Sequence, residues 1–184
     1  MEEIVVLEDI MKRKQIVDLI TAASLIVVGS VLLIFPLMKV LNVKYIFIGV
    51  LAYYGIMNLT QFILTSDSKD YEGLFTMIAS IVVLVILGFL DVASNPLNLA
   101  LTLFLWIIMM SLIKLKKSDY YHDKKKKTWV LKMITLILFI IVGLLSVINL
   151  YYGPTTQVLV LGYFYFVHGI LELVDPITNL LLED

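Results

Sequence analysis

Cysteine is absent from the chain, and charged residues are scarce. Without cysteine there are no disulfides, no thiol chemistry and no metal or cluster sites held by thiolates. Asp, Glu, Lys and Arg make up 16% of the 184 residues, whereas soluble proteins carry about 25%. Apolar residues instead reach 61%. This composition excludes a soluble enzyme and indicates a protein that lies in a membrane.

Charge-free apolar stretches predict where the chain crosses the membrane, because a spanning helix needs about 20 apolar residues to cross about 30 Å of hydrocarbon. The long stretch 133–171 must hold two spans, and the turn at Gly153-Pro154 separates them. The other four stretches are 19–38, 45–66, 73–90 and 92–113. The prediction is an all-α integral membrane bundle of six helices, in a single membrane domain that covers residues 1–184.

The positions of Lys and Arg predict the orientation, because basic segments stay on the cytoplasmic side. Of the 14 basic residues, only Lys39 and Lys44 lie on one side of the predicted spans, and the other twelve lie on the opposite side. Both termini are therefore expected in the cytoplasm. Residues 1–14 would form a cytoplasmic segment able to lie along the membrane surface, and residues 116–128 a basic cytoplasmic loop.

The basic loop contains a run of four lysines next to aromatic residues. Such a run can bind anionic lipid head groups, while the plainer interpretation is an ordinary topology anchor that the same charges must provide. The bilayer itself is an expected partner, and nucleic acid is not. The lysines of this run are Lys124, Lys125, Lys126 and Lys127.

Three helical hairpins, at 15–66, 73–115 and 129–176, look like copies of one unit. In the first helix of each pair a glycine precedes a proline, and in the second helix a small residue is followed three positions later by a polar one. Each unit holds two spans, so the copies would be parallel repeats; the alternative is a chance alignment of leucine-rich hairpins. The matching pairs are Gly29 and Pro36, Gly88 and Pro96, Gly143 and Pro154, then Gly55 and Asn58, Ser111 and Lys114, Gly169 and Glu172.

The patterns G-x6-P, G-x7-P and G-x10-P at the hairpin turns, with the segments 55–58 and 169–172, resemble the HdeD family of acid-resistance membrane proteins. The resemblance covers residues 18–175, and the middle hairpin departs most because Ser111 replaces the glycine. It implies a six-helix protein of a prokaryotic plasma membrane that supports envelope function or acid tolerance and is able to form homo-oligomers. It supplies no catalytic residues.

Ionisable residues inside spans are the candidate functional residues, because each is costly there. Lys114 and Glu172 occupy the same position in two hairpins, where the first hairpin has Asn58. One interpretation is an ion pair between Lys114 and Glu172 near the inner end of the bundle, with Asn58 beside it. The plainer alternative is that Lys114 and Lys132 reach to the membrane surface while Asp18 and Glu172 mark helix ends. Pro176 is expected to end the last helix and to leave Asp175 in cytoplasmic water.

His168 lies four residues before Glu172, so both side chains share one face of the last helix. The pair could titrate or relay protons, although a buried histidine bonded to a backbone carbonyl or to Tyr165 is the simpler expectation. Two ligands do not make a metal site. A second function class, a small transporter or channel, would use Asn58, Lys114, His168 and Glu172 as its polar lining.

Enzyme motifs give no support for catalysis. The sequence has no H-E-x-x-H, no G-x-x-x-x-G-K-[ST] and no G-x-S-x-G. We therefore expect neither an enzyme nor a cofactor or metal.

Overall fold

The computed structural model describes residues 2–35, 42–65, 71–90, 95–126, 128–152 and 156–181. These residues form six α helices and no strand. Each helix contains a segment long and apolar enough to cross a membrane, which confirms the all-α class and the six spans of a multi-pass membrane protein. The helices are α1 (Glu2–Ile34), α2 (Val43–Thr65), α3 (Glu72–Phe89), α4 (Pro96–Asp123), α5 (Trp129–Tyr152) and α6 (Gln157–Leu181).

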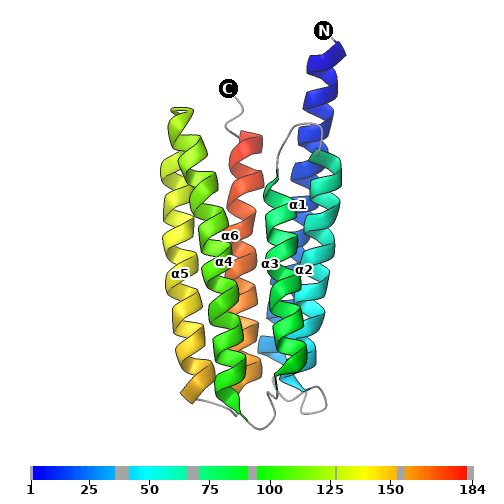
Figure 1. Ribbon diagram of the computed structural model, residues 1–184. Coiled ribbons are helices and arrows are strands. Elements are labelled where there is room, and N and C mark those ends of the chain that lie inside the picture. Colours follow the sequence, from blue (N-terminus) through cyan, green and yellow to red (C-terminus); the bar gives the residue numbers. More distant parts are fainter. Residues whose placement is uncertain are drawn as a thin grey trace.

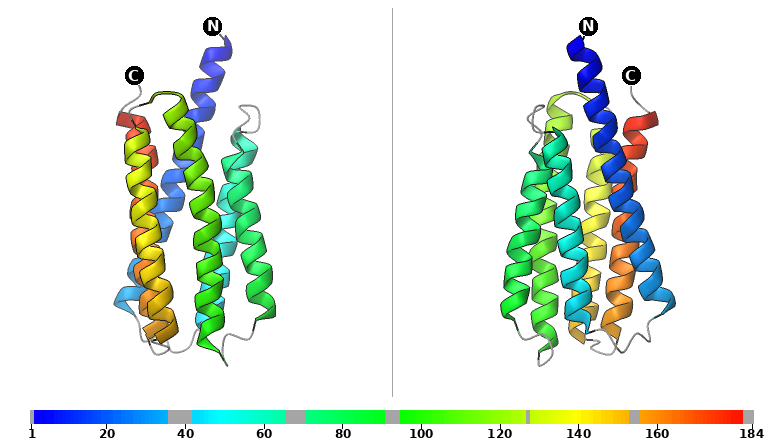
Figure 2. Two further views of the ribbon diagram at one scale, coloured as in Figure 1. Left: turned by 60° about the vertical axis from the view of Figure 1, so that its left-hand side comes forward. Right: turned by 90° about the vertical axis from the view of Figure 1, so that its right-hand side faces the viewer.

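The helices stand side by side in one elongated bundle (Figure 1). Consecutive helices contact one another, and α6 returns to pack on α1, which closes the ring. The most extensive contacts join α1 to α6, α4 to α5 and α2 to α3, and α1 lies along α6 in the turned views (Figure 2). The first residue of α1 and the last residue of α6 lie at the same end of the bundle. We call this end the terminal end and the opposite one the far end.

The outside of the bundle is apolar, whereas polar side chains lie inside it. Phe89 is 89% exposed and Ile34 70% exposed, while Gln61, Thr76 and His168 are all at least 95% buried. This arrangement is the reverse of a soluble protein and is expected where lipid is the solvent, since polar groups then face the bundle interior.

The crossing of α1 and α6 is tight because glycines line it. A Cβ added to Gly29 would lie 2.7 Å from the carbonyl oxygen of Gly162, and one added to Gly169 would lie 2.8 Å from that of Ala22. The two backbones therefore approach more closely than any larger residue would allow. Gly88, at the repeat position of Gly29, has no atom within 4 Å of such a Cβ, so the matching glycines do not share one packing role.

Three helices are longer than the sequence predicted. α1 already begins at Glu2, so residues 2–14 continue the first spanning helix instead of forming a separate segment. α4 continues to Asp123, so the prediction of a loop at 116–128 is wrong for 116–123. The charges there mark where the apolar stretch ends, but lysine, leucine and serine residues do not stop a helix.

α6 also continues past a proline. Pro176 lies inside the helix, which ends at Leu181. Proline removes the backbone hydrogen bond from its own nitrogen to the carbonyl of Glu172, and the remaining turns are retained. The prediction that Pro176 ends α6 is therefore wrong. The turn predicted at Gly153-Pro154 lies outside the described residues, between the end of α5 at Tyr152 and the start of α6 at Gln157.

Candidate functional site

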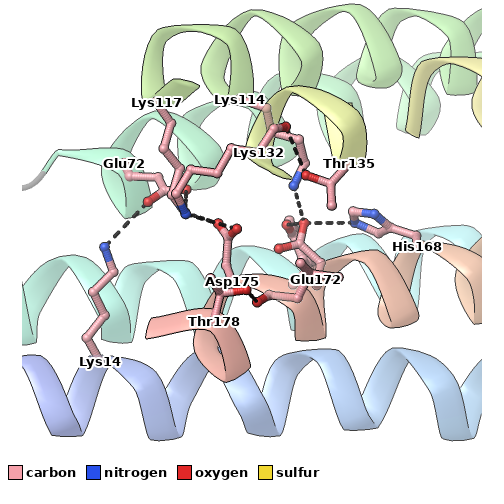
Figure 3. Close-up of polar contacts among 12 residues, drawn as sticks. Lys14, Glu72, Lys114, Lys117, Lys132, Thr135, His168, Glu172, Asp175 and Thr178 are labelled. Carbon is pink, nitrogen blue, oxygen red and sulfur yellow. Dashed lines mark hydrogen bonds and ion pairs between the residues drawn. The ribbon is translucent and has the colours of Figure 1, made fainter. Parts of the chain in front are cut away.

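Eight charged side chains gather inside the terminal half of the bundle, and Figure 3 shows the lysines and carboxylates among them that form ion pairs. Five helices contribute them, and positive and negative charges are equal in number. Glu172 lies about 14 Å from the end of α6, counting about 1.5 Å per residue, so the group reaches into the membrane-spanning part. We call this group the charged network; it comprises Lys14, Asp18, Glu72, Lys114, Lys117, Lys132, Glu172 and Asp175.

Lys117 is the centre of one half of the network. Its Nζ lies 2.7 Å from Oε1 of Glu72 and 2.6 Å from Oδ2 of Asp175. A second lysine reaches each of these carboxylates: Lys14 Nζ lies 3.4 Å from Oε2 of Glu72, and Lys132 Nζ lies 3.0 Å from Oδ1 of Asp175. These contacts connect α1, α3, α4, α5 and α6. Asp175 is therefore a paired interior group with a side chain only 20% exposed, and the prediction that it lies in water is wrong.

Lys114 and Glu172 form the other half. Lys114 Nζ lies 2.7 Å from Oε1 of Glu172, and both side chains are about one fifth exposed. The hydroxyl of Tyr54 donates to the same oxygen at 3.2 Å. Of the two sequence interpretations, the structure shows the ion pair and not a lysine extended to the membrane surface. Asn58 and both members of the pair line one small cavity.

His168 lies one turn deeper than Glu172 and is 1% exposed. Aromatic rings of α2, α4, α5 and α6 surround it, at centroid distances of 5.0 Å to Phe139, 5.4 Å to Trp106 and 5.8 Å to Tyr54. Its Nε2 lies 3.5 Å from Oε1 of Glu172. Within the described part of the chain, neither ring nitrogen makes a hydrogen bond, so the predicted bond to a backbone carbonyl or to Tyr165 is not formed.

The polar region ends at the depth of His168. Trp106, Phe139, Phe164 and Tyr165 are each at most 1% exposed and pack ring against ring. Beyond them the core is mainly apolar, as at Leu99 and Leu103, and the uncharged polar residues Thr102, Ser146 and Gln157 are also buried there. In the described part of the chain, the charged lining therefore does not continue beyond this layer.

A cavity of about 30 Å³ lies within the charged network, between α1, α2, α3, α4 and α6. This space holds about two water molecules. The carboxylate of Asp18, the amide of Gln61 and the hydroxyl of Thr76 line it, and these groups make no hydrogen bond or ion pair with another described residue. The amide nitrogen of Asn58 donates to the carbonyl of Tyr54 at 2.8 Å. The cavity wall thus offers polar groups that only water or a small ligand can satisfy.

The sequence interpretation missed part of the network. Lys14, Glu72 and Lys117 lie at the edges of the apolar stretches, where charges were assigned to cytoplasmic segments. Spacing gives a signal that could have found Lys14 and Lys117: Lys14 precedes Asp18 by four residues, and Lys114 precedes Lys117 by three. Residues at these spacings share one helix face, so charges there continue an interior face and do not belong to a loop.

The predicted lipid-contacting lysines lie at the end of α4 and in the turn after it. Lys124 Nζ lies 5.3 Å from the ring centroid of Tyr120, and Lys126 Nζ 5.4 Å from that of Tyr121. Both lysines are exposed at the terminal end, so their charges remain available to a membrane surface. Lys127 lies outside the described residues.

Over the described ranges, no three His, Asp or Glu side chains are arranged to hold a metal ion. No protein-family model, curated protein or solved structure matches the chain. The function is therefore argued from the geometry of the charged network and its cavity.

Proposed function

We propose that the chain is a non-enzymatic multi-pass protein of a prokaryotic plasma membrane, with the terminal end in the cytoplasm and the charged network as its working centre. The proposal rests on the eight charged side chains that lie between the helices, inside the bundle. Each such charge is costly in a membrane, and buried ion pairs add little stability compared with apolar packing. A bundle that only had to stay folded would have no need of them, and among the described residues of the far half no charged side chain is buried.

The role we propose is support of the envelope under acid or related stress, as the resemblance to the HdeD family implies. The equal number of positive and negative charges in the network supports this role. Four lysines are neutralised only while the four carboxylates are ionised, and a proton added to a paired carboxylate leaves a lysine charge uncompensated at low dielectric. Helix packing at the terminal end would therefore change when protons enter the network.

The proposed architecture is three parallel hairpin repeats. Asn58, Lys114 and Glu172, which share one repeat position, all line the same cavity, as expected for a pseudo-threefold arrangement of α2, α4 and α6. Around the ring of helices, extensive contacts alternate with less extensive ones. The extensive contacts join α1 to α6, α2 to α3 and α4 to α5. The exposed lysines at the end of α4 support the cytoplasmic orientation, and we propose that they contact anionic lipid head groups.

Acid survival tests the proposed role. Cells that lack the chain are expected to survive an acid challenge less well than the parent strain, and the wild-type chain is expected to restore survival. Lys117→Met should not restore it, because this lysine holds two carboxylates. Lys116→Met is the matched control, since Lys116 is exposed on the same helix. Both variants are compared at equal amounts in the membrane, and unchanged survival of the deleted strain would refute the role.

A small transporter or channel is the second candidate, and the cavity with its unsatisfied polar groups favours it. Transport would require the aromatic layer around His168 to open, because that layer closes the axis beyond the cavity. Purified chain in liposomes that contain a pH-sensitive dye tests this function. Proton flux above that of protein-free liposomes, reduced by Glu172→Gln, would support transport. Flux equal to that of protein-free liposomes under a proton gradient would exclude proton transport.

A further inference from the structure

Asp18 differs from the other three carboxylates of the charged network. Glu72, Glu172 and Asp175 each have a lysine Nζ within 2.7 Å. Asp18 lies on the cavity wall, and no lysine of the described chain lies within the 4.0 Å of an ion pair with it. Its charge therefore depends on the cavity water and not on a direct partner.

The charged groups that act on Asp18 come from four helices. Lys14 lies on its own helix, Glu72 on α3, Lys117 on α4 and Glu172 on α6. The two lysines are already held by carboxylates other than Asp18. α2 faces the cavity with uncharged polar groups and the phenol of Tyr54, and α5 adds Lys132, which is held by Asp175.

The four carboxylates differ in whether their protonation would break an ion pair. A proton on Glu72, Glu172 or Asp175 would remove a negative charge that lies 2.6–2.7 Å from a lysine ammonium group in the interior, which is unfavourable. A proton on Asp18 breaks no ion pair. The amide of Gln61 and the hydroxyl of Thr76 face the same cavity without hydrogen-bond partners among the described residues, so cavity water has groups that can hold it beside Asp18.

We propose that Asp18 is the proton-binding site of the charged network, and that water in the cavity delivers the proton from the terminal end. The transferred proton comes from a hydronium ion and bonds to a carboxylate oxygen, which leaves water and a neutral carboxyl group. The protonated network then carries one net positive charge, from four lysines and three carboxylates. This inference rests on the proposed function only in taking the network as the working centre.

Infrared difference spectroscopy of the full chain in nanodiscs tests the inference. The carbonyl band of protonated carboxyl groups is followed as the pH is lowered from neutral. The band of Asp18 is expected to appear before those of the three paired carboxylates, to be lost in Asp18→Asn, and to return at a shifted frequency in Asp18→Glu. Asp119→Asn is the matched control, because Asp119 is exposed on α4, and it should retain the Asp18 band.

Three results would overturn the proposal. They are an unchanged band in Asp18→Asn, a band that Asp18→Glu fails to shift, or a band that disappears when sodium chloride replaces choline chloride at constant pH. The last result would identify a site for sodium in place of a proton. Because the measurement records proton binding and not survival, a failure of the acid-stress role would leave the band present, and the two failures can be told apart.

Discussion

The charged network consists of residues that are far apart in the sequence and come together because their helix faces meet. Lys114 and Glu172 could be predicted as neighbours, because they occupy matching repeat positions. Lys117 could not, because it follows the apolar stretch 92–113 and lies within the loop predicted at 116–128. Its partners Glu72 and Asp175 lie 45 and 58 positions away in the chain, and only the packing of α3 and α6 against α4 brings them together.

The ion pair of Lys114 and Glu172 can be tested by a double-mutant cycle. Lys114→Met is expected to lower the free energy of unfolding by about 3 kcal/mol, since it leaves a carboxylate without its partner inside the bundle. Combined with Glu172→Gln, it should cost less than the sum of the two single changes, with a coupling of about 1–3 kcal/mol. Unfolding in mixed detergent micelles measures these values.

Lys116→Met is the control for this cycle. Lys116 lies on the same helix with an exposed side chain, so its change should stay within about 0.5 kcal/mol. Single effects that add up without coupling would mean that Lys114 and Glu172 do not form a pair in the membrane.

At the scale of helices, apolar stretches predicted the number and order of the elements but not their ends. Hydropathy indicates where the chain passes out of the lipid. A helix can continue beyond that point, because its backbone hydrogen bonds do not depend on apolar side chains. α4 therefore extends ten residues beyond the predicted span end at Ile113, to Asp123. This extension carries Lys117 on a partly buried face, so the error at the helix end is also the reason that the centre of one half of the network was missed.

The α1–α6 crossing gives a prediction for helix packing. Gly29→Ala should destabilise the chain by about 1–3 kcal/mol, because the added methyl group would meet the backbone of α6 at Gly162 and Phe166. Gly88→Ala is the matched control. Its Cβ would meet no atom within 4 Å, so the higher helix propensity of alanine should stabilise the chain by about 0.5–1 kcal/mol. Unfolding of both variants under the same conditions measures the difference.

A destabilisation of equal size in the two glycine variants would contradict this account of the crossing. It would mean that the matching glycines act through helix propensity or lipid contact, and not through the close approach of α1 and α6.

The whole molecule is divided along its length. The terminal half holds paired charges and a small polar cavity, a layer of aromatic rings around His168 closes the axis, and the far half is packed with apolar side chains. Composition alone could predict a membrane protein, but not this division, because it depends on which face of each helix turns inward. The division means that whatever the network binds reaches it from the terminal end.

The position of the terminal end relative to the cytoplasm is therefore the most direct test of the account. Because the chain has no cysteine, single cysteines can be introduced at exposed positions and labelled in intact cells with a membrane-impermeant maleimide. Asn42→Cys and Asn95→Cys at the far end should be labelled, whereas Asp119→Cys and Lys124→Cys at the terminal end should be labelled only after the membrane is opened. Labelling of Asp119→Cys or Lys124→Cys in intact cells would place the charged network at the outer surface and contradict the account.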